Sequence, residues 1–324
     1  MTDRNYDHLF LAYPDQNSQR MEAQLRYSIL ERILEVKIHP QVNGLEIEGH
    51  PIALAGVRLV LETIWTDVKK PAEVDEQMLR YLCELAKENR LETFLQAENK
   101  VILVTPKGMS VRGKTIGQCI YIDAVRKNEM VFCIGPAGCG KTYLGVALAV
   151  AALRAKEVSR LIFTRPAVEA GERLGFLPGD LKEKVDPYMQ PVYDALQTLL
   201  GEDLFMKYLD RRVIEVSPLA FMRGRTLDDA FILLDEAQNT TVEQMKMFLT
   251  RVGMNAKACI CGDITQIDLP RGVRNGLSDA VGILSKTQGI SVVSLTESDI
   301  VRNPLVQRIV KAYNSRDKIQ EEDH

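Results

Sequence analysis

The segment GPAGCGKT, residues 135–142, is the most informative part of this 324-residue chain. It matches the pattern G-x-x-x-x-G-K-[ST], in which a glycine-rich loop turns its backbone N–H groups toward phosphates. The apolar run MVFCI (130–134) precedes it, and the helical run TYLGVALAVAALRAKE (142–157) follows it. This strand–loop–helix context predicts a phosphate-binding P-loop at the start of an α/β domain.

Each residue type in the loop suits a nucleoside triphosphate with Mg²⁺. Lys141 is expected to reach the β- and γ-phosphates as a catalytic cation, and the Thr142 hydroxyl is expected to ligate the metal. The residues expected to contact the nucleotide are Gly135, Pro136, Ala137, Gly138, Cys139, Gly140, Lys141, Thr142 and Tyr143.

A carboxylate pair follows the apolar run of FILLDEAQNT (231–240). A buried strand would deliver Asp235 and Glu236 to its carboxyl edge, beside the P-loop. Asp235 would hold Mg²⁺, and Glu236 would act as the general base that orients the attacking water. The alternative, that these acids only cap a helix, is weaker because Thr241 and Gln244 already form a capping-box pattern for the next helix.

A third strand end, in CICGDITQIDLP (259–270), brings Asp263 and Gln266 to the same edge. Gln266 is suited to contact the γ-phosphate or the attacking water, so it is predicted to take part in catalysis. The alternative is a turn in which the Asp263 side chain accepts a backbone hydrogen bond.

Short apolar runs alternate with helical patterns from residue 130 onward. The runs are MVFCIG, RLIFTRP, AFILLDEAQ, KACICGD and ISVVSL. This alternation predicts an α/β fold with a buried parallel sheet flanked by helices. The expected organisation is a flexible tail (1–25), a small α+β domain (26–92), a connector (93–129), the P-loop core (130–313) and a polar tail (314–324).

The small domain is expected to begin with a β-hairpin. ILEVKIHP (33–40) and GLEIEG (44–49) alternate polar and apolar residues around Asn43-Gly44, a typical hairpin turn. Residues 53–68 and 74–89 then show helical periodicity. A hairpin with an amphipathic helix is weakly similar to part of a KH-type RNA-binding fold, but no G-x-x-G loop is evident. RNA contact and a packing or oligomerisation role both remain open, with the second favoured.

Composition is that of an ordinary globular protein, with 46% hydrophobic residues, 26% charged residues and a net charge of -3. No general basic field indicates nucleic acid, so any such surface must be local. The six cysteines form no C-x-x-C pair, which argues against a zinc site. Neither a signal peptide nor a membrane span is evident, so we expect a cytoplasmic protein.

Taken together, these stretches resemble the PhoH-like family of P-loop ATPases over about residues 100–313. The resemblance also rests on FTRPAVEAGERLGFLPGDLKEKVDPYMQPVYDAL, PLAFMRGRTL and DIVRNPLVQRIVKAY. It implies a RecA-like core related to superfamily 1 helicases, ATP hydrolysis and a role in RNA metabolism. It also implies that Gln118, in KTIGQ, reads the adenine base. Family members often carry Thr in place of Cys139 and His in place of Asn303, which puts any role of Asn303 in doubt.

Superfamily 1 helicases close their ATP site with a second lobe that supplies arginines, and this chain has room for one lobe. We therefore predict a ring-shaped homo-oligomer, such as a hexamer, with a catalytic arginine donated in trans. Arg302 is the first candidate, followed by Arg251, Arg165 and Arg173.

The leading functional hypothesis is a Mg²⁺-dependent ATPase that binds or remodels RNA, with a ribonuclease as a further partner. The alternatives are a nucleotide-switched scaffold and a small-molecule kinase. An RNA-facing surface is expected around Arg223, Arg225, Arg271 and Arg274. Cys139, beside Lys141 and a helix N-terminus, is expected to be a reactive, oxidation-sensitive thiol.

Overall fold

The computed structural model describes residues 6–15, 27–67, 76–98, 101–166 and 181–301, together with 306 and 309. It divides into two compact units, a smaller one that contains the described residues up to 96 together with 306 and 309, and a larger one that covers residues 97–301. Within these described ranges, no helix has both the length and the apolar character needed to cross a lipid bilayer.

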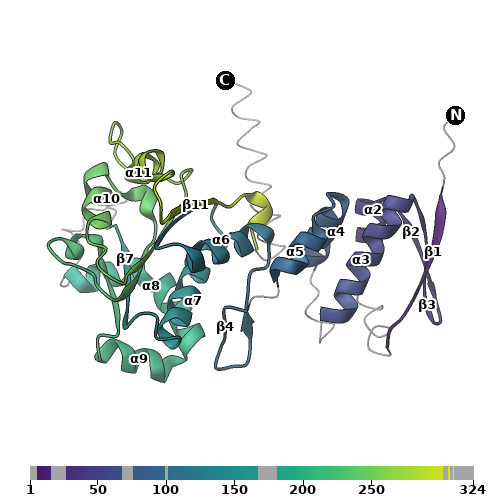
Figure 1. Cartoon of the computed structure of the whole chain (residues 1–324), viewed down its shortest axis with the longest axis horizontal. Helices are drawn as coiled ribbons and strands as arrows, with labels where there is room; N and C mark the ends of the chain where they lie inside the picture. The colour runs from purple at the N-terminus through teal and green to yellow at the C-terminus, as the bar shows by residue number, and fades with distance from the viewer. Residues whose placement is uncertain are drawn as a thin grey trace. The chain divides into compact units, whose positions relative to one another are not determined.

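The larger unit is built on a six-stranded sheet in the order β11-β6-β10-β9-β7-β8. Figure 1 labels its strands β7 and β11. Every neighbouring pair is parallel, as the alternation of apolar runs and helices predicts. The strands are β6 (Met130–Ile134), β7 (Arg160–Arg165), β8 (Ile214–Pro218), β9 (Ala230–Leu234), β10 (Lys257–Gly262) and β11 (Ile290–Ser294).

Helices cover both faces of this sheet, so alternate side chains of one strand enter two different cores. Phe231 and Leu233 pack in the first core, whereas Ile232 and Leu234 pack in the second. The first core is covered by α6 (Ile116–Lys127), α7 (Lys141–Arg154), α8 (Leu181–Leu200) and α9 (Glu202–Asp210). The second is covered by the 3₁₀ turn η3 (Leu219–Met222) and by α10 (Val242–Leu249) and α11 (Gly276–Leu284).

Five of the six strands coincide with the predicted apolar runs, and β8 was missed. Its sequence IEVSP carries Glu215 and Ser217, which suits an edge strand but gives no continuous apolar signal. The hairpin β4 (Leu103–Val104) and β5 (Ser110–Val111) and helix α6 occupy the segment expected to be a connector. Tyr121 and Val125 of α6 are buried in the first core, so this segment is part of the larger unit.

The smaller unit contains an antiparallel sheet in the order β1-β3-β2. The predicted hairpin is present, but β2 and β3 are joined by Val42-Asn43, because Gly44 already pairs with Gln41. The strands are β1 (Asp7–Ala12), β2 (Lys37–Gln41) and β3 (Gly44–Gly49), and the helices are α2 (Tyr27–Leu34), α3 (Pro51–Asp67), α4 (Glu76–Lys87) and α5 (Leu91–Glu98).

Two predictions for the smaller unit need correction. Strand β1 lies in the segment that we expected to be a flexible tail. The prediction missed it because β1 pairs with β3, which is distant in sequence, and local patterns do not reveal such a pairing. The first hairpin strand begins at Lys37, because Ile33 and Leu34 end helix α2. That helix buries Ile29, Leu30 and Leu34 on one face. Its last turn runs into the alternating polar and apolar residues of β2, so the sequence pattern did not show where the helix ends.

Candidate active site

The P-loop connects β6 to α7 and forms one wall of a cavity at the carboxyl edge of the sheet. Gly138 and Gly140 adopt φ values of 87° and 83°, in the left-handed region where glycine is favoured. The cavity has a volume of about 280 Å³. Its lining residues are Ala137, Gly138, Gly140, Lys141, Thr142, Tyr143, Asp235, Glu236, Gly262, Asp263 and Gln266. The structure therefore brings together the residues predicted from three separate segments.

Lys141 is buried inside the loop. Its Nζ donates hydrogen bonds to the carbonyl oxygens of Gly135 (2.6 Å) and Pro136 (2.9 Å). The Nζ group is therefore held within the loop, at the wall of the cavity.

Thr142 and Asp235 provide a site that suits a divalent cation. The Thr142 Oγ1 donates to Asp235 Oδ1 at 2.8 Å, so a hydroxyl and a carboxylate meet across the cavity. Asp263 Oδ2 is buried and has no hydrogen-bond partner within the described ranges. An all-oxygen set of this kind fits Mg²⁺, which prefers few protein ligands together with water and phosphate.

Arg165, at the end of β7, makes the strongest contacts with Asp235. Its Nε and Nη2 donate to Asp235 Oδ2 at 2.9 and 2.5 Å, and its Nη1 donates to the Tyr188 carbonyl on α8 at 2.6 Å. The guanidinium of Arg165 is thus occupied within its own chain, and its action on a neighbouring subunit stays a prediction. Arg251, another candidate, likewise donates to the Arg225 carbonyl at 3.2 Å.

Glu236 differs sharply from its neighbour. Its side chain is 42% exposed, whereas that of Asp235 is 3% exposed. Its backbone has a φ of 53°, an uncommon left-handed conformation for a non-glycine residue. Gln238 Nε2 donates to Glu236 Oε2 at 2.6 Å, which fixes the carboxylate at the cavity.

Gln238 is a site residue that the sequence reasoning missed. It is buried, and its Oε1 accepts the Asp263 backbone N–H at 2.9 Å, so one amide links the ends of β9 and β10. The signal was its position two residues after Glu236 in DEAQ. It was overlooked because a glutamine at a strand end has many ordinary structural roles.

Gln266 is exposed at the mouth of the cavity. Its backbone N–H donates to the Asp263 carbonyl at 3.0 Å. Asp263 Oδ1 accepts from Thr265 N (2.9 Å) and Thr265 Oγ1 (2.6 Å), so the alternative of a side-chain-supported turn is correct for Asp263. The same turn presents Gln266 to the cavity, and the two interpretations are compatible.

The family model and the sequence relatives agree on one family. The family model described as "PhoH-like protein" matches residues 110–314. A PhoH-like protein of Bacillus subtilis is 48% identical over 288 residues, which are 89% of this chain and 90% of that protein. The chain belongs to the PhoH-like family.

Further matches extend this picture. A PhoH-like protein of Mycobacterium bovis is 49% identical over 284 residues, covering 88% of this chain and 80% of that protein. Among solved structures, the Pif1 helicase of Candida albicans matches with a TM-score of 0.34 and 17% identity, covering 62% of this chain and 43% of that chain. At this level the structural match adds nothing to the family assignment.

Four residues named from the resemblance or the ring hypothesis are not part of the described cavity. Gln118, on α6 of this PhoH-like chain, is 4% exposed and is absent from the lining of the cavity. Arg302, Asn303 and Arg173 lie outside the described residues, so their expected roles stay predictions.

Cys139 contradicts the expectation of a reactive thiol. Its side chain is fully buried. Lys141 Nζ lies 3.7 Å from Cys139 Sγ, yet burial outweighs this positive charge and raises the pKa of the thiol above its ordinary value. The thiol is therefore protonated at neutral pH and inaccessible, which is the opposite of a redox-sensitive cysteine.

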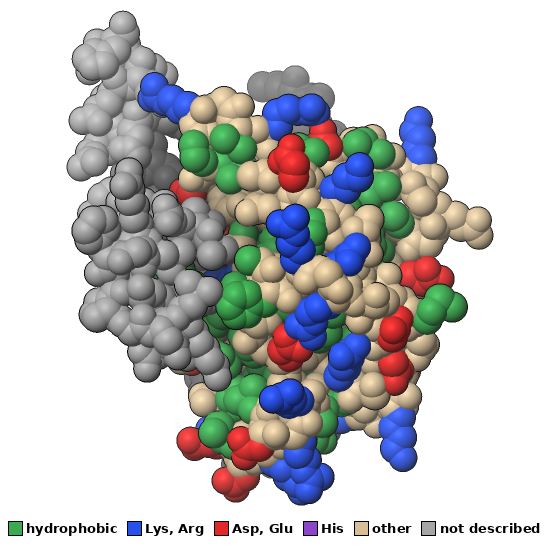
Figure 2. Space-filling view, turned by 90° about the vertical axis from the view of Figure 1, so that its left-hand side faces the viewer, with side chains coloured by type: hydrophobic (Ala, Val, Ile, Leu, Met, Phe, Trp, Pro, Cys, Tyr) green, Lys and Arg blue, Asp and Glu red, His purple; other side chains and the backbone are tan. Residues whose placement is uncertain are grey.

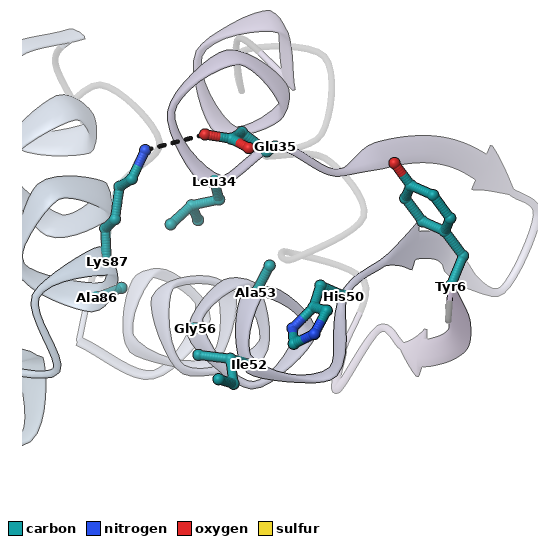
Figure 3. A pocket seen from close by; sticks show the side chains of 9 residues that line it. All are labelled: Tyr6, Leu34, Glu35, His50, Ile52, Ala53, Gly56, Ala86 and Lys87. Atoms are coloured by element: carbon teal, nitrogen blue, oxygen red, sulfur yellow. Dashed lines mark hydrogen bonds and ion pairs between the residues drawn. The ribbon is translucent and has the colours of Figure 1, made fainter. Parts of the chain in front are cut away.

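A second cavity, of about 500 Å³, lies in the smaller unit (Figure 3). Lys87 and Glu35 form an ion pair of 3.2 Å on one side of it, and Tyr6 and His50 lie on the other. Lys87 also donates to the Ile33 carbonyl at 3.3 Å, so its charge is already compensated. The cavity at the P-loop, where Lys141, Thr142 and Asp235 meet, is therefore the candidate active site.

Proposed function

We propose that this chain hydrolyses ATP in a Mg²⁺-dependent reaction and couples hydrolysis to the binding or remodelling of RNA. The observation that carries this proposal is the arrangement of the two carboxylates. Asp235 is buried against the Thr142 hydroxyl, whereas Glu236 is exposed in the same cavity. One carboxylate can then hold a metal while the other contacts water.

The roles of the side chains follow from these positions. Lys141 would stabilise negative charge on the phosphates, and Thr142 with Asp235 would hold Mg²⁺, which supplies further neutralisation of that charge. Glu236, oriented by Gln238, would accept a proton from the attacking water. Gln266 would contact the γ-phosphate or that water from the turn after β10. This arrangement favours water over a small-molecule acceptor, so hydrolysis is preferred to the kinase alternative.

The test is phosphate release by the full chain with ATP, with and without Mg²⁺ and single-stranded RNA. We expect hydrolysis that needs Mg²⁺ and Lys141 and that RNA accelerates. Phosphate release that survives Lys141→Ala would contradict the assignment of the site. Hydrolysis unaffected by RNA, combined with ATP-dependent capture of a protein partner such as a ribonuclease, would favour the scaffold alternative.

We also propose self-association into a ring that completes the site with an arginine from a neighbouring subunit. No arginine is among the described residues that line the cavity, and Arg165 and Arg251 are engaged within the chain. Arg302 remains the first candidate. Mixing Arg302→Ala with Lys141→Ala subunits should restore part of the activity. Failure to do so, with both variants still assembling, would contradict donation in trans.

A basic surface for RNA is the remaining part of the proposal. Figure 2 shows Lys and Arg side chains along the middle of one face of the molecule, with Asp and Glu among them. Of the four arginines predicted to contact RNA, Arg225 pairs with Glu215 at 2.5 Å and Arg274 pairs with Asp279. Arg223 and Arg271 are exposed and are the better candidates.

Charge reversal tests this surface. Arg223→Glu should weaken RNA binding and reduce its salt dependence, since each phosphate contact contributes to that dependence. Arg211→Glu, an exposed arginine at the end of α9, is the matched control. Equal RNA affinity of Arg223→Glu and the parent would remove this residue from the surface.

A further inference from the structure

Gln118 is bound on both ends of its side-chain amide by groups of the same chain. Its Nε2 donates to the Cys139 carbonyl of the P-loop at 3.0 Å and to the Asp299 carbonyl at 3.5 Å. Its Oε1 accepts the Lys114 backbone N–H at 2.7 Å. Since a primary amide has two N–H donors, both donors are occupied by backbone carbonyls.

Asp299 extends this network to the segment after β11. Its Oδ1 accepts from Thr115 Oγ1 at 2.6 Å and from the Gly117 N–H at 3.2 Å. Its Oδ2 accepts from the Thr296 N–H at 2.8 Å. A Cβ at Gly117 would lie 2.5 Å from both carboxylate oxygens, so only glycine permits this approach.

The P-loop is therefore tied at two consecutive residues. Gln118 binds the Cys139 carbonyl, and the Val301 N–H donates to the Gly138 carbonyl at 3.1 Å. Both hydrogen bonds are therefore donated to backbone carbonyl groups of the P-loop. Holding these carbonyls fixes the orientation of the peptide groups whose N–H atoms face the cavity.

We propose that Gln118 positions the P-loop instead of reading the base, and that the site consequently accepts purine triphosphates with little discrimination between ATP and GTP. This inference rests on the proposed hydrolase function. Gln118 is 4% exposed and does not line the cavity, and its Nε2 donates to two backbone carbonyls while its Oε1 accepts the Lys114 N–H, so its amide has no free N–H donor for a base. Tyr143 does line the cavity and is 38% exposed. An aromatic ring stacks on any base, because every base has a π-face.

The experiment compares the affinity for ATP, GTP and inorganic tripolyphosphate, which has no base. All are measured by calorimetry on the full chain in the presence of Mg²⁺. For the parent we expect ATP and GTP to bind within about threefold of each other. Gln118→Ala should weaken all three ligands by the same factor, about tenfold, as expected for the loss of one to two hydrogen bonds. Selective loss of ATP binding, with tripolyphosphate unaffected, would overturn the proposal.

Two further variants complete the design. Asp299→Asn keeps the side-chain shape but replaces an acceptor oxygen by a donor, so it should reproduce the uniform loss. Unchanged tripolyphosphate binding in this variant would contradict anchoring through Asp299. Gln197→Ala, an exposed glutamine on α8, is the control and should bind all three ligands as the parent does. These experiments measure ligand affinity, whereas the proposed function is tested by phosphate release. Failure of the positioning role of Gln118 can therefore be distinguished from failure of the proposed hydrolase function.

Discussion

The two sides of the cavity differ in how completely they are organised. On one side, Lys141, Thr142 and Asp235 have hydrogen-bond partners within the chain, and all three are held by strands, a helix or the P-loop. On the other side, Gln266 is exposed, and the Glu236 side chain is 42% exposed although Gln238 holds its carboxylate. The difference indicates that the proposed phosphate and metal site is preorganised, whereas exclusion of water from the proposed hydrolytic side would require a further element.

This contrast also separates two kinds of energetic contribution. A fixed cation and a fixed carboxylate bind charge without reorganisation, which favours tight nucleotide binding. An exposed general base works in a high-dielectric environment, where electrostatic effects are weak. Binding should therefore resist changes on the exposed side, and hydrolysis should be sensitive to them.

The largest expected effect is at Glu236. Glu236→Gln keeps the shape of the side chain and can retain contact with Gln238, but it removes the base. We expect the hydrolysis rate to fall by about 10²–10⁴-fold, the usual contribution of general-base catalysis. ATP affinity should change little, because Glu236 lies on the exposed side.

The measurement pairs single-turnover hydrolysis with calorimetric ATP binding. Asp235→Asn is the comparison variant, and it should weaken Mg²⁺-dependent binding as well as hydrolysis. If Glu236→Gln lost binding to the same extent as Asp235→Asn, the distinction between the two sides of the cavity would be wrong.

The next effect concerns the packing beneath the organised side. A Cβ at Gly145 of α7 would lie 2.8 Å from Leu233 Cδ1 and 3.1 Å from the Tyr121 hydroxyl. Overpacking of this kind typically costs about 1–3 kcal/mol, so Gly145→Ala should lower the free energy of unfolding by that amount. Gly282→Ala on α11 meets no atom within 4 Å and should stabilise the protein by about 0.5–1 kcal/mol.

Thermal or denaturant unfolding of the two variants checks this pair. Both change glycine to alanine in a helix of the larger unit, so the difference between them isolates the close approach of α7 to β9. Equal stability of the two variants would show that α7 can shift away from the sheet, and that the P-loop is less firmly supported than its contacts indicate.

Sequence patterns predicted the central sheet and most of the cavity. The P-loop, Asp235, Glu236 and Gln266 were found because each follows an apolar run, and parallel strands deliver their carboxyl ends to one edge. Arg165 and Gln238 escaped because their roles depend on partners far away in sequence or across strand ends. Strand β1 escaped for the same reason. The depth of burial of Cys139 and Gln118 could not be predicted, because it depends on how separate segments pack around them.

Arg165 allows a smaller but informative test of the organised side. Its guanidinium donates to Asp235 Oδ2, on the carboxylate proposed to hold Mg²⁺, and like charges at short range repel. Arg165→Ala should therefore lower the Mg²⁺ concentration at half-saturation of nucleotide binding, by about two- to tenfold for an interaction of order 1 kcal/mol. Arg160→Ala, on the same strand and bonded to the Asp228 carbonyl, is the control. A higher Mg²⁺ requirement in Arg165→Ala would mean that Arg165 supports the metal site instead of competing with it.

The smallest expected effect is at Cys139. Its reactivity reports how often the P-loop opens and exposes the buried thiol to reagents. A buried thiol with a raised pKa reacts slowly with N-ethylmaleimide, because reaction requires both the thiolate and access. The parent and Cys139→Ala should therefore lose ATPase activity at the same rate during alkylation at neutral pH. If Cys139→Ala resisted inactivation and bound ATP protected the parent, the P-loop would have to open often enough to expose Cys139. The organised side of the cavity would then be organised only when nucleotide is present.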